Sequence, residues 1–415
     1  MEFTKYKLGE IGKICNGSTP STTEESNYDG DIIWATPKDL SDQQTKYFYK
    51  GARNISQKGF DSCSTQMIPA YNILMSSRAP IGLFAINKVD CCTNQGFKNI
   101  ILDKSIADVD YMYYYLKYHV KEIEALGSGT TFKEVSKVSF ENYEISIPSL
   151  SNQQKIASIL SALDEKIALN RAINQNLEAL AKQLYDYWFV QFDFPNEEGK
   201  PYKSSGGKMV WNDKLKREIP QNFCVKPLSD IIEVKDGTHD SPQPQEKGYY
   251  LLTSKHLTDN GLDFANAYRI SKEDYQNINK RSKVDNSDIL FSMIGTIGNR
   301  YIVGEGEINF AIKNMALFKT SSELWFKVFF YLYLASCDYK HYENNCMSGS
   351  IQKFMSLKSL REMPILFDKK IICEFSKKMD FLFKMIENLR QENIDLTKQR
   401  DELLPLLMNG QVTIE

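Results

Sequence analysis

The sequence predicts a mixed α/β (α+β) protein built by tandem duplication, with two globular domains separated by two long antiparallel coiled-coil helices. Three observations predict it. The second half of the 415-residue chain repeats the first at an offset of roughly 216 to 220 residues. Each half combines short apolar strand patterns with an aromatic helix pattern. Each half is also followed by a long heptad-like run that contains neither glycine nor proline.

Composition favours large cores and excludes several classes of protein. Hydrophobic residues make up 42% of the chain and aromatic residues 12%. Because 51 Lys and Arg stand against 53 Asp and Glu, any nucleic-acid contact must use local patches. The charged N-terminal run and the short apolar runs predict a soluble, cytoplasmic protein with no membrane partner. Eight scattered cysteines and four histidines lack ligand spacing, so we expect reduced thiols and no metal.

Matching segments follow one another in the same order in both halves. Each half has an opening apolar run, a glycine turn, a strand-loop-strand pattern, a Lys-Asn pair before an apolar strand, an aromatic helix and a glycine loop. These segments are 8–11 and 228–231, 16–20 and 236–242, 72–82 and 288–298, 98–102 and 313–317, 111–123 and 324–339, and 127–133 and 347–353. The match predicts that the halves share one fold.

Two long helices follow the two halves. Ser151 and Gln154 form a capping box at the start of the first. Its apolar steps alternate four and three, are interrupted at Asn170 and resume at Ile173, and those of the second helix continue without a break. Because the runs have similar lengths, we expect the helices to pair antiparallel. The predicted helix-helix seam consists of Ile156, Leu160, Leu163, Ile167, Ile173, Leu177, Leu180, Leu184, Phe375, Met379, Leu382, Ile386, Leu389, Leu396 and Leu403.

These patterns divide the chain into five parts. They are a first globular domain, a long helix, a connector rich in Gly, Pro, Ser and Lys, a second globular domain and a second long helix, at 1–150, 151–190, 191–220, 221–367 and 368–408.

Motifs for catalysis are weak. The chain has no P-loop, no methyltransferase-type Asn/Asp-Pro-Pro-aromatic motif and no repeated nucleophile-histidine arrangement. Glu198 and Glu233 each begin a Glu-x-Lys element of the kind found in metal-dependent nucleases, but a three-letter match is expected by chance. The sequence therefore favours a non-catalytic binding protein. A scaffold with duplicated peptide-binding domains and an autonomous nuclease remain alternatives.

Two similar domains on a rigid helical spacer suit a bipartite DNA site. Arg78 could bind guanine, amides such as Gln95 and Asn314 could bridge adenine, and Ser, Thr and Lys could bind phosphates. Turn capping and solvated surface charge are the alternative roles of these side chains. The candidate DNA-binding residues are Gly17, Ser18, Thr19, Ser77, Arg78, Asn94, Gln95, Lys98, Ser128, Thr130, Thr131, Lys133, Thr238, His239, Lys255, Ser292, Met293, Lys313, Asn314, Ser348, Ser350 and Lys353.

A set of motifs resembles the specificity (S) subunit of type I restriction-modification systems. The motifs cover the whole chain in order, at 147–157, 163–167, 187–195, 199–209, 236–239 and 403–405. The resemblance implies two target recognition domains and no active site. It also implies that each domain reads one half of an asymmetric, split double-stranded DNA sequence.

The resemblance also implies partners. Two methyltransferase (M) subunits would bind S-adenosylmethionine and dock on the helices, and motor/restriction (R) subunits would use ATP and Mg²⁺. We expect the chain itself to bind no cofactor. One departure stands out, because the second helix begins with Asp368-Lys369-Lys370 where the first has Gln153-Gln154-Lys155. The two docking surfaces are therefore expected to differ.

Overall fold

The computed structural model describes residues 2–43, 45–129, 133–258, 261–294, 297–346 and 354–412. The chain divides into two compact units: unit 1 is Met1–Leu169 with Asn393–Glu415, and unit 2 is Asn170–Glu392. The long helices α7 (Leu150–Tyr185) and α12 (Lys369–Met408) each contribute one portion to each unit. Within the described ranges, no helix is long and apolar enough to cross a membrane.

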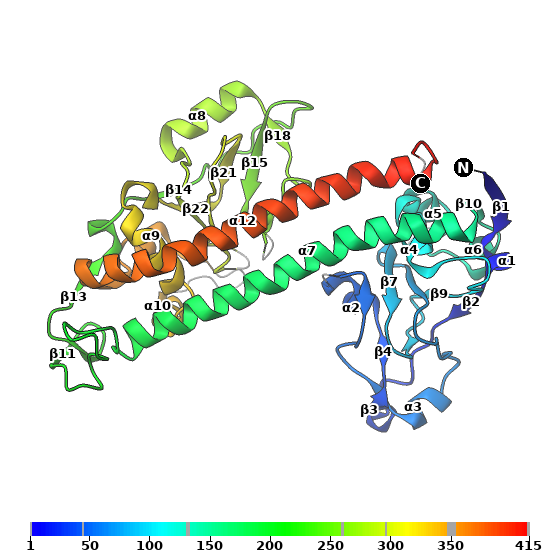
Figure 1. Cartoon of the computed structure of the whole chain (residues 1–415), viewed down its shortest axis with the longest axis horizontal. Helices are drawn as coiled ribbons and strands as arrows, with labels where there is room; N and C mark the ends of the chain where they lie inside the picture. The colour runs from blue at the N-terminus through cyan, green and yellow to red at the C-terminus, as the bar shows by residue number, and fades with distance from the viewer. Residues whose placement is uncertain are drawn as a thin grey trace. The chain divides into compact units, whose positions relative to one another are not determined.

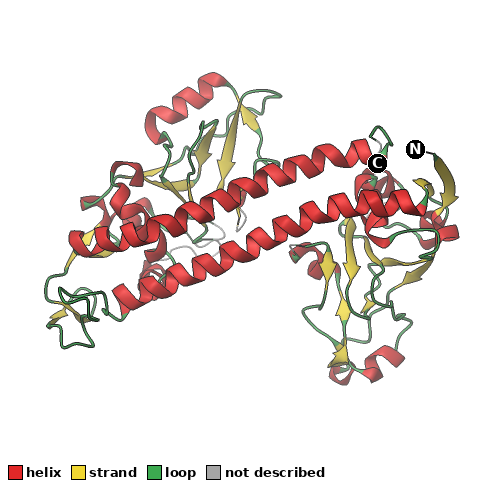
Figure 2. Ribbon diagram, viewed as in Figure 1, coloured by secondary structure: helices red, strands yellow, loops and turns green. Residues whose placement is uncertain are grey.

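Unit 1 combines short strands with short helices (Figures 1 and 2). Before α7 its elements are β1 (Phe3–Lys7), α1 (Leu8–Ile11), β2 (Gly12–Asn16), η1 (Glu25–Asn27), β3 (Tyr28–Ile32), β4 (Trp34–Ala35), α2 (Pro37–Asp42), β5 (Tyr47–Phe48), α3 (Gln57–Asp61), β6 (Ile73–Ser77), β7 (Ile81–Asn87), β8 (Cys92–Thr93), β9 (Lys98–Leu102), α4 (Val109–Tyr118), α5 (Val120–Ala125), α6 (Lys137–Glu141) and β10 (Glu144–Pro148). The main sheet has the order β2-β9-β6-β7-β5, and β1-β10 and β4-β8 form separate pairs.

Unit 2 repeats this plan and adds a hairpin in the connector. After α7 its elements are η2 (Asp186–Val190), β11 (Met209–Asn212), β12 (Arg217–Pro220), β13 (Cys224–Pro227), η3 (Leu228–Asp230), β14 (Val234–Asp236), β15 (Tyr249–Thr253), η4 (Ser254–His256), β16 (Leu257–Thr258), β17 (Gly261–Leu262), β18 (Arg269–Ile270), α8 (Lys272–Ser282), β19 (Ile289–Ser292), β20 (Arg300–Ile302), β21 (Phe310–Lys313), β22 (Met315–Phe318), η5 (Thr320–Ser322), α9 (Leu324–Tyr333), α10 (Cys337–Cys346), α11 (Leu357–Arg361) and β23 (Pro364–Phe367). Its sheets include β14-β22-β19-β20 and β18-β15-β21.

The strand pairings confirm the predicted duplication. The order β2-β9-β6-β7 has the same antiparallel directions as β14-β22-β19-β20, and the parallel pair β4-β8 matches the parallel pair β15-β21. One predicted match was wrong. Ile100 lies opposite Ile73, and Phe318 lies opposite Ile289. Ile100 therefore corresponds to Phe318. Lys98, two residues earlier, corresponds to Ala316 and not to Lys313. The two Lys-Asn pairs coincide only in letters, because Lys98 begins β9 whereas Lys313 ends β21.

The aromatic helices form the centre of each core. In unit 1, Tyr111 of α4 shares a buried cluster with Ile156 of α7 and Leu407 of α12. In unit 2, Phe329 of α9 lies 4.7 Å from Phe189, ring centre to ring centre, and both belong to the cluster that contains Phe375 of α12. Both long helices are therefore integral to each core, since their apolar faces are buried against the aromatic helix.

The long helices pair antiparallel within each unit. In unit 1, Arg400 Nη1 of α12 lies 2.8 Å from Asp164 Oδ1 of α7. In unit 2, Asn170 of α7 bonds to Glu392 of α12, and Asn174 bonds to Ile386. Residue numbers increase along α7 while those of its α12 partners decrease, so the two helices are antiparallel.

The predicted seam of α7 needs one correction. Leu180 is 46% exposed, and the neighbouring Ala181 is buried in its place. The alternation of four and three does not stop at Asn170, because Asn170 and Asn174 themselves occupy buried seam positions. A search for apolar residues alone treats these two amides as a gap in the seam.

Candidate nucleic-acid interface

The glycine turns occupy equivalent positions in the two units. Gly17 follows β2 and Gly237 follows β14. A Cβ atom on Gly17 would lie 1.9 Å from the Asn94 carbonyl oxygen, and one on Gly237 would lie 2.5 Å from the Ile312 carbonyl oxygen. Only glycine allows each loop to approach so closely. Each turn is therefore held against the end of the parallel strand that precedes β9 or β22.

Backbone hydrogen bonds fix this approach. Ser18 N donates to Thr93 O at 2.9 Å, and Thr238 N donates to Ile312 O at 3.0 Å. The Asn94 side chain caps its own turn, since its Oδ1 accepts from Gly96 N at 2.9 Å. That is the capping role considered for Asn94 from the sequence.

The same contact brings an amide side chain to each turn. In unit 1, Thr19 Oγ1 donates to Gln95 Oε1. In unit 2, His239 Nδ1 lies 2.8 Å from Asn314 Oδ1. The structure thus brings together the sequence candidates Thr19 with Gln95 and His239 with Asn314, at matching positions of the repeat.

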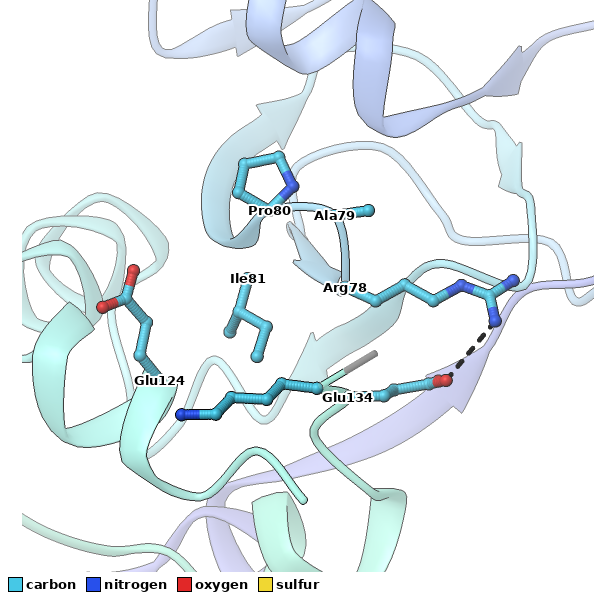
Figure 3. A pocket seen from close by; sticks show the side chains of 7 residues that line it. Arg78, Ala79, Pro80, Ile81, Glu124 and Glu134 are labelled. Atoms are coloured by element: carbon cyan, nitrogen blue, oxygen red, sulfur yellow. Dashed lines mark hydrogen bonds and ion pairs between the residues drawn. The ribbon is translucent and has the colours of Figure 1, made fainter. Parts of the chain in front are cut away.

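The Arg78 loop joins β6 to β7 and borders a pocket of about 570 Å³. The pocket is lined by Arg78, Ala79, Pro80, Ile81, Glu124, Lys133 and Glu134. Figure 3 shows the Arg78 guanidinium turned toward the Glu134 carboxylate, and the distance from Nη1 to Oε2 is 3.5 Å. Because about a third of each side chain is exposed, this ion pair is weak and could be exchanged for a DNA phosphate or a guanine.

Burial corrects five of the sequence candidates. Buried side chains, which are not offered to a ligand, are those of Ser77, Lys98, Thr238, Ser292 and Met293. Lys98 Nζ lies 3.0 Å from Glu134 Oε1, which neutralises its charge below the Arg78 loop. Residue type and loop position suggested that these residues contact DNA. Ser77 and Ser292, however, are the last residues of β6 and β19, and every side chain of these two strands is buried.

Other candidates lie around the second glycine turn. Lys313 Nζ donates to Ser241 Oγ, and Ser254 Oγ donates to Asn314 O at 3.0 Å. Lys255, next to Ser254, is exposed. Ser128 and Lys133 are exposed as well, whereas Thr130, Thr131, Ser348, Ser350 and Lys353 lie outside the described residues.

The structure adds residues that sequence reasoning missed. Asp236 accepts from Arg281 of α8 through Oδ1, and its Oδ2 lies 3.1 Å from His239 Nε2. The Arg281 side chain is 60% exposed whereas that of Asp236 is 9% exposed. Asp236 lies within the 236–239 motif, but its pairing with Arg281 could not be predicted from it. Arg281 and Glu134 carry no sequence signal, because the role of each depends on a partner distant in the chain.

Known proteins of one family match both halves of the chain. The family model for the type I restriction modification DNA specificity domain matches residues 1–179 and 220–397. The type I restriction enzyme MjaIX specificity subunit of Methanocaldococcus jannaschii is 32% identical over 423 residues, covering 99% of this chain and 93% of the relative. The EcoR124I/EcoR124II specificity subunit of Escherichia coli is 28% identical over 203 residues, covering 46% of this chain and 48% of the relative.

Solved structures show the same fold. The type I restriction-modification system S subunit from M. genitalium superposes with a TM-score of 0.51 at 17% identity, covering 98% of this chain and 96% of that one. Together with the duplicated sheets and glycine turns, the match of the family model to both halves shows that this chain belongs to the type I restriction-modification specificity subunit family.

Proposed function

We propose that this chain is the DNA-recognition subunit of a type I restriction-modification complex and reads a bipartite, asymmetric site with one half-site per domain. The observation that carries the proposal is the repeated turn, in which equivalent glycines allow the turn of each domain to contact an amide side chain. Backbone amides, hydroxyls and Asn or Gln side chains are the groups that position and read a duplex. The different side chains at the two turns would give two different half-sites.

We propose further that the chain is not itself an enzyme and that chemistry belongs to its partners. Two methyltransferase subunits would bind S-adenosylmethionine and dock on the helices, and motor/restriction subunits would bind ATP and Mg²⁺. Glu198 and Lys200 pair with each other at 2.9 Å with both side chains mostly exposed, an arrangement that suits a solvated connector more than a nuclease site. The duplex substrate implies a cytoplasmic location.

The test is single-molecule sequencing of host DNA for N6-methyladenine, with the gene intact and deleted. We expect one split motif to disappear on deletion. If a split motif persists unchanged, or none is present with the gene intact and a methyltransferase partner expressed, the proposal fails.

A domain exchange tests the assignment of one half-site to each domain. Replacing residues 1–150 with those of a related subunit should change one half-site and leave the other intact. A change in both halves would contradict independent reading by the two domains.

A further inference from the structure

The two units hold their amide side chains in the same orientation. Gln95 Oε1 accepts from Thr19, and Asn314 Oδ1 lies 2.8 Å from His239 Nδ1. With the oxygen turned inward, the amide NH₂ group is the end that points away from the partner. An amide reads a base by accepting at one end and donating at the other. The orientation of Gln95 and Asn314 therefore decides which base edge each one fits.

His239 differs from Thr19 because both of its ring nitrogens face acceptors. Nδ1 lies 2.8 Å from Asn314 Oδ1, and Nε2 lies 3.1 Å from Asp236 Oδ2. A neutral imidazole carries a single N–H, so it can donate to only one of these oxygens. Both contacts can be hydrogen bonds at the same time only when each ring nitrogen carries a proton.

Loss of one proton from the ring changes which end of the Asn314 amide can bond to Nδ1. The carboxylate of Asp236 retains the N–H at Nε2, which leaves Nδ1 as an acceptor. The Asn314 amide satisfies that acceptor by turning its NH₂ group inward, and its carbonyl oxygen then points outward.

Resting on the proposed function, we infer that the protonation state of His239 sets the orientation of the Asn314 amide and so selects the base edge that the second domain reads. With the ring protonated, the outward NH₂ group favours an acceptor such as N7 or O6 of guanine or O4 of thymine. With the ring neutral, the outward oxygen favours the amino group of adenine or cytosine. His239 is a positioning residue, and Asn314 is the reader.

The His239 ring is open to solvent and lies among several charged groups. The His239 side chain is 59% exposed, and histidine changes charge between about pH 5 and 8. The Asp236 carboxylate faces both the His239 ring and the Arg281 guanidinium. The charged groups on the surrounding elements include Lys235 of β14, which pairs with Glu233 at 3.2 Å. They also include Asp240, which accepts from Thr238 Oγ1, Lys313, which donates to Ser241 Oγ, and the exposed Lys255.

Unit 1 provides a control within the same molecule. The Thr19 hydroxyl donates to Gln95, and a threonine hydroxyl does not change its protonation state in this pH range. Reading by Gln95 should therefore be independent of pH, whereas reading by Asn314 should not.

The experiment uses the full chain assembled with its methyltransferase partner. The probes are duplexes that carry the split motif found by methylation mapping, with each base pair replaced in turn. Gln95→Ala and Asn314→Ala identify the base pair that each amide reads. Between about pH 6 and pH 8, we expect the preference at the Asn314 base pair to change by about tenfold and that at the Gln95 base pair to stay constant.

Two variants separate this device from a merely structural role. H239K keeps a permanent donor, so the preference seen at acidic pH should persist at both pH values. H239L should abolish the pH dependence. A wild-type preference that is constant with pH throughout the second half-site, or a pH dependence that survives in H239L, overturns the inference while the split-site function stands. Failure of every duplex to bind removes the proposed function and the inference together.

Discussion

Asn170 Nδ2 of α7 donates a hydrogen bond to Glu392 Oε2 of α12, at 2.7 Å. Asn170 is fully buried, and one turn later Asn174 Nδ2 donates to the Ile386 carbonyl oxygen at 3.3 Å. Two successive amides thus form a buried polar layer in the helix-helix seam. A polar seam residue selects one register, because sliding the helices would leave the buried amide without its acceptor.

Replacing Asn170 tests how much this polar layer stabilises the helix pair. Asn170→Ala removes a buried hydrogen bond to a charged group, so we expect the free energy of unfolding to fall by about 2 kcal/mol. Urea denaturation of the full chain measures the change. Leu169→Ala is the matched control on the same helix, since Leu169 is 55% exposed and should change stability by less than about 0.5 kcal/mol. Equal effects of the two substitutions would contradict a role for the amide.

The glycine turns predict separable effects on the two half-sites. The backbone at Gly237 is not left-handed, so the cost of Gly237→Ala is steric: its Cβ would meet the Ile312 carbonyl oxygen at 2.5 Å. Displacing the turn should reduce discrimination within the second half-site by about tenfold, measured by binding of the assembled complex to singly substituted duplexes. Gly17→Ala should do the same for the first half-site only.

Asn16→Ala is the control for the glycine substitutions, because Asn16 is exposed beside the first turn and a small side chain there meets no such obstacle. An effect of both glycine substitutions on the same half-site would show that the turns do not act one per domain.

Periodicity and repetition in the sequence were enough to predict the duplicated fold, because the strand patterns, the aromatic helices and the heptads are local signals. The positions of Asn170 and Asn174 were missed, since two amides in a seam resemble a break in it. Gln95 and Asn314 were predicted as single candidates, but their pairing with Thr19 and His239 depends on a close approach that only Gly17 and Gly237 permit. Ser77 and Lys98 are buried because of tertiary packing, which residue type alone does not predict.

A buried lysine ties the first globular domain to its helix. Lys46 Nζ donates to Asp110 Oδ1 at 2.6 Å and to Ser161 Oγ of α7 at 2.7 Å, and the Lys46 side chain is 3% exposed. Lys46→Met would leave the Asp110 carboxylate without its countercharge, so we expect a loss of about 3 kcal/mol in the free energy of unfolding. Lys50→Met removes an exposed charge from the same segment and should have little effect. Tyr71 also donates its hydroxyl to Asp110 Oδ2. A loss below about 1 kcal/mol for Lys46→Met would show that water or Tyr71 compensates Asp110.

His256 should make the stability of unit 2 depend on pH. Burial lowers the pKa of the His256 imidazole from its ordinary value of 6.5. The ring is 1% exposed, accepts from Thr253 N at Nδ1 (2.9 Å) and donates from Nε2 to Asn266 O (3.1 Å), which is the bonding of a neutral ring. In the window between the lowered and the ordinary pKa, the unfolded chain binds the proton more readily than the folded chain. The stabilisation is therefore complete above about pH 6.5 and is lost as the pH falls through the lowered pKa.

The measurement is the difference in free energy of unfolding between wild type and His256→Gln, followed by urea denaturation from about pH 7.5 to pH 5. We expect the wild-type advantage to shrink by about 1 kcal/mol toward acidic pH, because only the wild type must keep a neutral ring. Background carboxylates titrate in both proteins and cancel in the difference. His341, exposed on α10, gives the matched control, and His341→Gln should leave the slope unchanged. A wild-type advantage that stays constant or grows as the pH falls would contradict this prediction. It would mean that the folded protein accommodates a charged His256 ring, although Thr253 N already donates a hydrogen bond to Nδ1.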